Sequence, residues 1–543
     1  MRKWNGWGDA STDFPANPGV QSFLKQLLGD SHPLPDAAHE AVLVSVPASR
    51  LPAHPLISTH PDIRLMHARG QSLPDWLALR SGAIGIFPDG VAEPESGAEV
   101  RVLLDFARVH DLVVIPYGGG TSVAGHITPL ADSRPVLTLS LAKMNALLAL
   151  DDESQIATIG AGANGPQVES LLNARGYTLG HFPQSFELST LGGWVVTRSS
   201  GQQSLRYGRI EQIFAGGTLE TLQGTLEIPT FPASSAGADL REIVLGSEGR
   251  IGVLTDVKVR VTRLPEHEEF HVFFLPGWKA ASTAIRELAQ RKMSFSMLRL
   301  SNAEETRTQL ILAGHAKSLA LLDRMLRIRG AGDGRCMMTV GVTGSKATVK
   351  FALRELKKVI KPYGAVGTGQ LLGRKWAANR FKAPYLRESL WQLGYAVDTL
   401  ETAVDWPKVT PTINAIESAL RGGLQADGEK VLAFTHLSHL YAQGSSIYTT
   451  YAYRVGPDYA QTLARWEKLK RAASEAIVNM GGTISHQHGV GRDHAPYLSA
   501  EKGELGMSTL RVLCHHFDPD GRLNPGKLLL EPLQGILLKK GND

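Results

Sequence analysis

A glycine-rich corner constrains the fold of this chain more than any other feature of its sequence. The apolar residues 112–115 are followed directly by Pro116, Tyr117, Gly118, Gly119, Gly120, Thr121 and Ser122. Three successive residues without a Cβ let the backbone approach a ligand closely and aim its N–H groups at phosphate oxygens, and two hydroxyls follow. We therefore expect a strand that ends in a diphosphate-binding loop.

The spacing of this corner excludes two common nucleotide loops. The dinucleotide fingerprint needs a third glycine three places after the second, and the triphosphate loop needs a lysine beside Ser or Thr. Taken alone, the corner is equally well interpreted as a flexible turn between two strands.

Two further segments rich in small residues favour a ligand site over a turn. Residues 181–201 (HFPQSFELSTLGGWVVTRSSG) contain few long charged side chains, and residues 246–254 (GSEGRIGVL) lead into an alternating strand at Val257, Val259 and Val261. Three such loops on separate strands could converge on one extended ligand.

The order of these motifs resembles the flavin-binding domain of the vanillyl-alcohol oxidase superfamily. Within it, RKWNGWGD (residues 2–9), ETAVDW (401–406) and SHQHGVG (485–491) resemble the alkyldihydroxyacetonephosphate synthase family. The resemblance implies an α+β protein, in which an FAD-binding domain of two α/β subdomains faces an α+β cap domain built on an antiparallel sheet.

The resemblance also implies that the three loops hold FAD, and the absence of an attachment motif predicts non-covalent binding. Residues 116–122 would hold the diphosphate. The expected cofactor-binding residues further along the chain are Gln184, Ser185, Ser189, Thr190, Gly193, Thr197, Arg198, Ser200, Glu248, Gly249, Ile251, Gly252 and Val253.

Changes in composition divide the chain into four parts. Residues 1–80 form a proline-rich lead that we expect to wrap the body, and residues 81–265 form the FAD-binding domain. After residue 265 the pattern of strands and longer helices predicts the cap, residues 266–480. Residues 481–543 carry SHQHGVG and DPDGRLNPGK, and we expect them to contribute to the active site and return to the FAD domain.

Tyr448 is the first candidate catalytic residue. It lies in a predicted strand whose period of two places Tyr448, Thr450, Ala452 and Arg454 on one face. A phenol with an ordinary pKa near 10 is a poor base at neutral pH, so a proton-abstracting tyrosine needs nearby positive charge to lower that pKa. A half-buried strand tyrosine is the alternative, and the family resemblance implies the active-site role.

His486 and His488 flank Gln487, and an extended segment would point both imidazoles the same way. The family places three histidines here, so Gln487 removes one titratable group. A neutral amide is also a weak ligand for a hard cation. We therefore predict no metal site, although His436 and His439 lie upstream, and an exposed histidine-rich turn is the alternative.

Arg387 matches the family's substrate-binding arginine. A guanidinium group suits phosphate or carboxylate because it donates paired hydrogen bonds in one plane. A surface ion pair with the adjacent Glu388 is the alternative role.

The resemblance implies a transferase that exchanges the acyl group of acyl-dihydroxyacetone phosphate for a fatty alcohol through a flavin N5 adduct, in ether lipid biosynthesis. An FAD-dependent oxidoreductase of a D-2-hydroxyacid or related alcohol is the alternative, and a non-catalytic flavin-binding protein is a second. Tyr448, His486, His488 and Arg387 are the candidate catalytic residues, and the expected partner is an anionic or lipid-like small molecule.

Charge and hydropathy narrow the kinds of partner and the cellular location that we expect. A formal net charge of +5 in 543 residues argues against nucleic acid. The polar N-terminus lacks a secretory core, and two cysteines suit a reducing compartment, so we expect a cytoplasmic protein. The apolar tail, residues 528–540, makes peripheral membrane contact possible, and a homodimer is the expected assembly.

Overall fold

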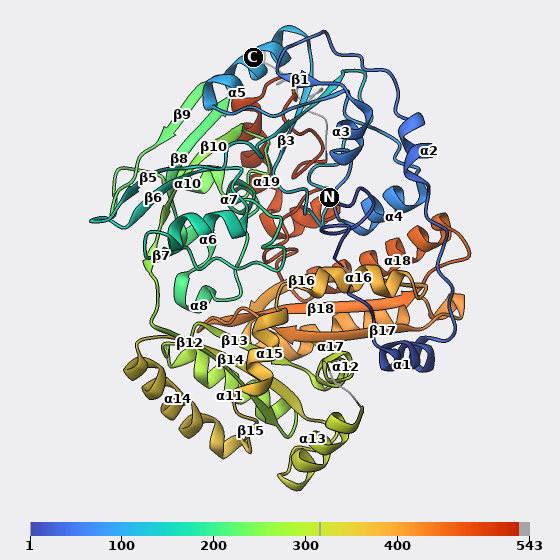
Figure 1. Ribbon diagram of the computed structural model, residues 1–543, viewed down its shortest axis with the longest axis vertical. Helices are drawn as coiled ribbons and strands as arrows, with labels where there is room; N and C mark the ends of the chain where they lie inside the picture. Colours follow the sequence, from blue (N-terminus) through green and yellow to red (C-terminus); the bar gives the residue numbers. More distant parts are fainter. Residues whose placement is uncertain (1, 13, 314–315, 531–543) are drawn as a thin grey trace, which may run out of the picture.

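The computed structural model describes residues 2–12, 14–313 and 316–530. Figure 1 shows two bodies, an upper one that holds strands β2–β10 and helix α19, and a lower one built around a large sheet of strands β12–β18. Strands β12–β18 lie between residues 267 and 454. The chain therefore separates into an N-terminal body and a cap, and the domain boundaries at residues 80, 265 and 480 stay predictions.

The first sheet of the N-terminal body has four strands in the order β1 (Ile57–Ser58), β2 (Gly90–Ala92), β4 (Val136–Ser140) and β3 (Val113–Tyr117). β2, β4 and β3 are parallel, and β1 is antiparallel to β2. Helix α5 (Gly97–Val109) begins after Ser96, whose hydroxyl accepts a hydrogen bond from the Glu99 amide. The Glu99 carboxylate accepts a hydrogen bond from the amide of Glu95, one residue before the N-cap, so the helix start resembles a capping box shifted by one residue.

The second sheet of this body is antiparallel, in the order β5 (Leu147–Asp151), β6 (Ile156–Gly160), β10 (Val253–Arg260), β8 (Phe214–Thr221) and β9 (Gly224–Ile228). Helix α6 (Gly165–Asn173) starts with a full capping box between Asn164 and Gln167. Helix α7 (Leu191–Val196) follows, and β7 (Tyr177–Thr178) pairs with β11 (Thr262–Arg263). This sheet carries two of the three loops that the sequence singles out.

The cap is a seven-stranded antiparallel sheet. Its order is β15 (Val366–Gly367), β12 (His267–Leu275), β14 (Cys336–Gly344), β13 (Met297–Ser301), β17 (Val431–Leu437), β18 (Gly444–Arg454) and β16 (Tyr395–Asp405). Ile447, Thr449, Tyr451 and Tyr453 of β18 are fully buried, beneath helix α17 (Trp406–Gly422). Tyr448 and Thr450 belong to the opposite face, which lines a cavity, as the period of two predicts.

Other helices cover the two bodies. Those of the cap are α11 (Trp278–Gln290), α12 (Ala303–Ala313), α13 (Ala316–Ile328), α14 (Lys346–Ile360), α15 (Leu371–Asn379), α16 (Ala383–Trp391) and α18 (Tyr459–Asn479). The remaining ones are α1 (Pro18–Leu28), α2 (His39–Val44), α3 (Pro61–Met66), α4 (Leu73–Ser81), α8 (Ser204–Tyr207), α9 (Ile210–Ile213), α10 (Arg241–Val244) and α19 (Leu498–Phe517). Short 3₁₀ turns occupy Lys361–Tyr363, Gln425–Asp427 and Ala495–Tyr497.

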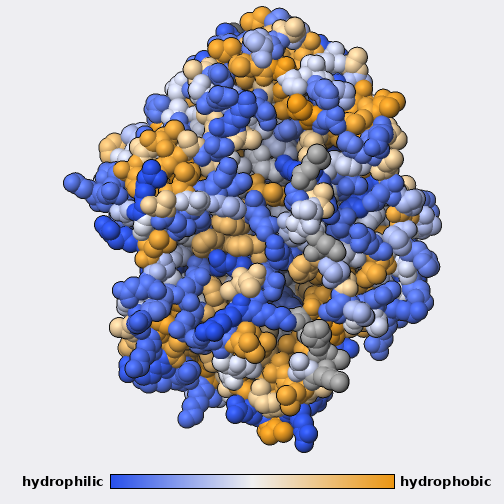
Figure 2. Space-filling model, in the orientation of Figure 1, coloured by the Kyte–Doolittle hydropathy of each residue, from blue (hydrophilic) through white to orange (hydrophobic). Residues whose placement is uncertain are grey.

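The proline-rich lead contacts both bodies. Helix α1 packs its apolar residues Val20, Phe23 and Leu24 on the cap, and α4 contacts α18. The face seen in Figure 2 mixes hydrophilic residues with smaller hydrophobic groups. Among the described residues no helix has the length and apolarity to cross a membrane, and the predicted membrane-contacting tail lies outside them from residue 531 onward.

Candidate active site

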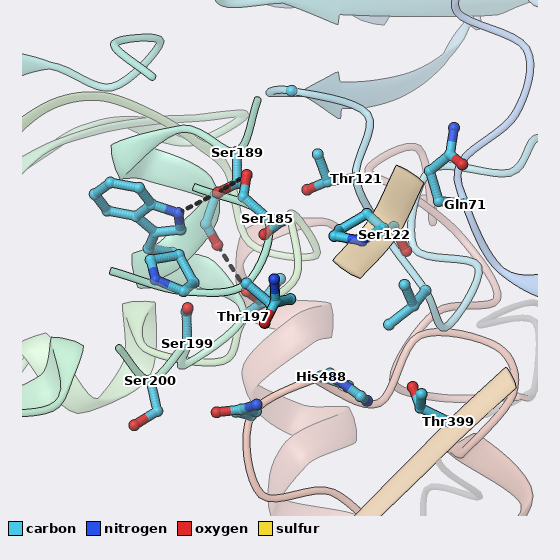
Figure 3. Close-up of a pocket in the computed structure, with 18 of the residues that line it drawn as sticks. Gln71, Thr121, Ser122, Ser185, Ser189, Thr197, Ser199, Ser200, Thr399 and His488 are labelled. Atoms are coloured by element: carbon cyan, nitrogen blue, oxygen red, sulfur yellow. Dashed lines mark hydrogen bonds between the residues drawn. The ribbon is translucent and has the colours of Figure 1, made fainter. Parts of the chain in front are cut away.

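A cavity of about 540 Å³ lies between the two bodies. Its lining comes from the glycine corner, the loops around residues 183–202 and 248–254, helix α16, and strands β16, β17 and β18 of the cap. Figure 3 shows the hydroxyls of Thr121, Ser122, Ser185 and Thr197 on one side, with His488 and Thr399 across from them. The three loops therefore converge on one site, together with residues of the cap.

The glycine corner is packed so tightly that side chains would not fit. A Cβ on Gly119 would lie 1.8 Å from the carbonyl oxygen of Leu188, and Gly120 has a φ of +69°. In the described part of the chain, the amides of residues 119–122 donate no hydrogen bond to another protein group. Unpaired N–H groups that line a cavity suit an anion, so these residues fit the diphosphate of FAD.

Most of the predicted cofactor residues lie on this cavity. Ser189 accepts a hydrogen bond from the Trp194 indole, and Thr190 caps helix α7. The predicted residues on the lining are Pro116, Tyr117, Gly118, Gly119, Gly120, Thr121, Ser122, Gln184, Ser185, Ser189, Thr190, Gly193, Thr197, Ser200, Glu248, Gly249 and Gly252. Their assignment to FAD itself stays a prediction.

Three predicted cofactor residues do not line the cavity. Ile251 and Val253 are each 1% exposed and pack into the core of the N-terminal body. Arg198 turns outward, because it donates to the carbonyl of Leu245 and pairs with Glu242 on the surface. The glycine-rich sequence places the backbone of these segments correctly but does not show which side chains face the ligand.

A row of neighbouring polar side chains connects the glycine corner to the C-terminal loop. The Ser122 hydroxyl lies 2.7 Å from His126 Nδ1, and His126 Nε2 lies 3.1 Å from Glu248 Oε1. Glu248 accepts hydrogen bonds from the amides of Val490 and Gly491, at 2.6 and 2.8 Å. The loop that carries the histidine motif is thus anchored to the loops expected to hold the cofactor.

The structure corrects the expectation that Tyr448 has a lowered pKa. Its ring stacks on His436 at 4.8 Å between centroids, and its hydroxyl donates to Thr399 Oγ1 at 3.1 Å. Burial raises the pKa of Tyr448 above its ordinary value, and the surrounding carboxylates add to that effect. Tyr448 therefore keeps its proton at neutral pH, and its hydroxyl is the donor in the hydrogen bond with Thr399.

The structure also corrects the expected orientation of the two histidines. Residues 486–488 form a bend, so His488 faces the cavity whereas His486 does not line it. His486 Nε2 lies 2.7 Å from the Tyr441 hydroxyl and 2.6 Å from Arg209 Nη1. Burial lowers the pKa of both histidines, and for His486 the Arg209 charge lowers it further.

Glu401 is the reason for this bend. Its fully buried carboxylate accepts hydrogen bonds from the amides of Gln487 and His488, at 2.6 and 2.5 Å. The same carboxylate lies 3.7 Å from His488 Nδ1 and 3.9 Å from His486 Nδ1. In the sequence ETAVDW stands out only as a family motif, and a glutamate directly before the small and apolar residues 402–404 is its signal for a buried carboxylate.

Arg387 lies where an anion could reach it. Its Nη1 donates to the carbonyl of Gln71 at 2.7 Å and the guanidinium stacks on Trp76, while the buried Nε and Nη2 have no partner. Glu388 pairs with Arg80 and Lys3, so the expected alternative of an Arg387–Glu388 ion pair is wrong. Two unpartnered guanidinium donors beside a cavity suit phosphate or carboxylate.

A second charged cluster on the cavity was missed by sequence reasoning. Arg299 Nη2 donates to Glu305 Oε1 at 2.6 Å, and His436 Nδ1 lies 3.0 Å from the same oxygen. These residues come from β13, α12 and β17, and no short motif connects them. In the described residues no group of three or more His, Cys, Asp or Glu side chains is arranged to hold a metal ion, and the absence of a metal stays a prediction.

Comparison with known families identifies the class of protein. Residues 88–228 match the FAD binding domain family, and residues 264–528 match the family described as FAD linked oxidases, C-terminal domain. Together with the amide-lined corner, this defines an FAD-dependent enzyme of the FAD-linked oxidase type.

Individual relatives identify the family within that class. The chain is 30% identical to the alkyldihydroxyacetonephosphate synthase of Dictyostelium discoideum over 86% of this chain and 77% of the relative. It is 28% identical to that of Caenorhabditis elegans over 95% and 93%. A solved structure of alkyldihydroxyacetonephosphate synthase superposes with a TM-score of 0.83 and 26% identity, and covers 96% of this chain and 98% of the other. The chain belongs to the alkyldihydroxyacetonephosphate synthase family, and the expected fold class and FAD as cofactor are confirmed, while non-covalent attachment stays a prediction.

Proposed function

We propose that this protein exchanges the acyl group of an acyl-dihydroxyacetone phosphate for a fatty alcohol. One observation carries the proposal: a single cavity joins an amide-lined diphosphate corner to a chamber that holds Arg387, Tyr448 and His488. The relatives that share this architecture are named for the same activity. The alternatives of a hydroxyacid oxidoreductase and of a non-catalytic flavin protein are not favoured by these comparisons.

The reaction is redox neutral overall. A C1–O bond to the fatty acid breaks, a C1–O bond to the alcohol forms, and the hydroxyl proton of the alcohol is released with the fatty acid. FAD, when bound in this cavity, would supply an electron-accepting ring. The residues of the chain bind the substrates, orient them and move protons.

Arg387 binds the phosphate of the substrate, because it lines the cavity and its guanidinium nitrogens Nε and Nη2 have no protein partner among the described residues. This fixes the three-carbon unit with its C1 end toward Tyr448 and His488. The apolar part of the lining, which receives the fatty chain, consists of Leu312, Leu386, Leu390, Val397 and Phe434.

His488 and Tyr448 have different roles in the proposed reaction. Burial keeps His488 uncharged at neutral pH, so it can accept the hydroxyl proton of the alcohol, whereas Tyr448 keeps its proton and can stabilise the departing carboxylate by a hydrogen bond. Their rings meet edge to face at 5.5 Å between centroids, and both residues line the cavity. His486, outside the cavity, supports the loop and does not contact substrate.

The test uses the yellow purified protein without oxygen. Palmitoyl-dihydroxyacetone phosphate and hexadecanol are added, and hexadecyl-dihydroxyacetone phosphate is measured by mass spectrometry. Arg387→Met should reduce kcat/KM by about tenfold or more, as expected for the loss of a charged hydrogen bond, while the exposed Arg374→Met should not. Lasting bleaching by a 2-hydroxyacid without ether formation would refute the proposal.

We also propose a cytoplasmic location, a homodimer and peripheral membrane contact. These proposals rest on composition and on the general frequency of dimers.

A further inference from the structure

Residues 2–9 form a small closed loop at the centre of the molecule. Arg2 and Asp9 meet in an antiparallel bridge, and the amide of Lys3 donates to the carbonyl of Gly8 at 3.0 Å. The loop contacts the glycine corner of the N-terminal body through Arg2 and helix α16 of the cap through Lys3. The loop is therefore placed at the same junction as the cavity.

Arg2 reaches the glycine corner directly. Its Nη2 donates to the carbonyl of Gly119 at 2.8 Å, and a Cβ on Gly120 would lie 2.6 Å from the same nitrogen. Residues 116–122 contain no lysine or arginine, although the diphosphate of FAD carries two negative charges. The Arg2 guanidinium, which comes from another part of the chain, brings positive charge to this corner.

Trp7 and Gln71 extend the contact. Trp7 is buried and lines the cavity, and its indole N–H has no partner. The side chain of Gln71 donates to the carbonyl of Gly6, and its backbone amide donates to that of Ser122 at 2.7 Å. The closed loop is thus bound to Gly119 directly and to Ser122 through Gln71.

The other side of the loop rests on helix α16 of the cap. Gly8 has a φ of +75°, and a Cβ there would lie 2.5 Å from the Tyr385 ring. Lys3 pairs with Glu388 at 3.4 Å. Helix α16 also carries Arg387, so the loop fastens the cofactor corner to the substrate side of the cavity.

We propose that residues 2–9 are part of the cofactor site. Arg2 supplies positive charge to the diphosphate corner, Trp7 closes the cavity beside it, and the loop retains FAD by holding the corner against α16. This assignment concerns FAD retention and is independent of the alkyl exchange. It can therefore fail while the proposed function stands, and the reverse is also true.

The first experiment compares Arg2→Gln with Arg108→Gln, an exposed arginine distant from the cavity. Flavin fluorescence gives the FAD dissociation constant and release rate of the reconstituted protein at several salt concentrations. We expect Arg2→Gln to weaken FAD binding by about tenfold or more and to flatten its dependence on salt, because a charged hydrogen bond is lost. Unchanged affinity and salt dependence would overturn the role of Arg2.

Two further variants separate charge from packing. Arg2→Lys keeps the charge, so its salt dependence should resemble that of the unmodified protein. If Arg2→Gln does not fold, the release rate of the Gly8→Ala variant decides the question. Gly8→Ala should speed FAD release, because the Cβ collides with Tyr385. Gly176→Ala is its matched control, with a similar φ of +79° and no atom within 4 Å. Equal release rates for the two alanine variants would refute the retaining role of the loop.

Discussion

At the scale of single residues, the active site is organised by one buried carboxylate. The Glu401 carboxylate accepts hydrogen bonds from two backbone amides of the histidine loop and lies within 4 Å of both His486 and His488. One histidine is thereby turned into the cavity and the other behind it. A glutamate outside the cavity lining thus determines which imidazole faces the cavity.

Glu401→Gln should lower kcat about tenfold to a hundredfold and leave the KM for acyl-dihydroxyacetone phosphate nearly unchanged, because Glu401 acts through His488. The carboxylate raises the pKa of His488 against the larger effect of burial. Removing its charge lowers that pKa, so the acidic limb of the rate profile should move to lower pH. The pH dependence of kcat measures this shift, with the exposed Glu467→Gln as control. A merely structural role would lower activity without moving the limb.

The sequence predicts a residue's role well when that role depends on backbone geometry. It predicts the role poorly when it depends on residues that are distant in the chain. The glycine corner could be predicted because only glycine allows its close contact with Leu188. The orientation of His486 could not, because it depends on Glu401, distant in the chain. The pKa of Tyr448 was wrongly expected to be lowered, because the sequence does not show that burial dominates over any nearby cation.

At the scale of elements, the cap sheet shapes the substrate chamber. Its strands β16, β17 and β18 contribute Val397, Phe434 and Tyr448 to the cavity from one face, while helix α17 covers the other. The alternation along β18 could be predicted from the sequence, since a strand places every second residue on the same face. The pairing of β13 with β17 could not, because these strands lie far apart in the chain.

Val397→Phe should shorten the alcohol that the protein accepts, because the larger ring fills the apolar part of the cavity. We expect kcat/KM for hexadecanol to fall about tenfold or more relative to octanol, and Val397→Ile to show a much smaller change. A series of alcohols of increasing length measures the effect. Equal losses for short and long alcohols would show that the chain does not lie against β16.

At the scale of the whole molecule, the C-terminal segment returns to the N-terminal body. Lys527 is completely buried there and donates to the carbonyl of Thr128 at 2.7 Å. Burial lowers the pKa of Lys527 to about 7, and the neighbouring Arg492 and Arg250 add to the effect. The NPGK motif predicted this return, but not the burial of its lysine.

This buried lysine predicts how stability depends on pH. Between about pH 7 and the ordinary lysine pKa, the unfolded chain holds a proton that folded Lys527 has lost, so the free energy of unfolding should rise with pH. Lys527→Met should remove a slope of about 1 kcal/mol per pH unit, and the exposed Lys430→Met should not. Urea unfolding at saturating FAD between pH 7 and 9.5 measures the slope. Parallel curves for Lys527→Met and the unmodified protein would contradict the assignment.

The central claim is that one cavity joins an FAD-binding corner to a chamber in which a fatty alcohol replaces an acyl group. Hexadecanol labelled with ¹⁸O tests it directly, in an anaerobic reaction with palmitoyl-dihydroxyacetone phosphate followed by mass spectrometry. The account predicts an alkyl product that carries the label, unlabelled palmitate in equal amount, and no net reduction of the flavin. A product without the label, or palmitate release without any ether, would contradict it.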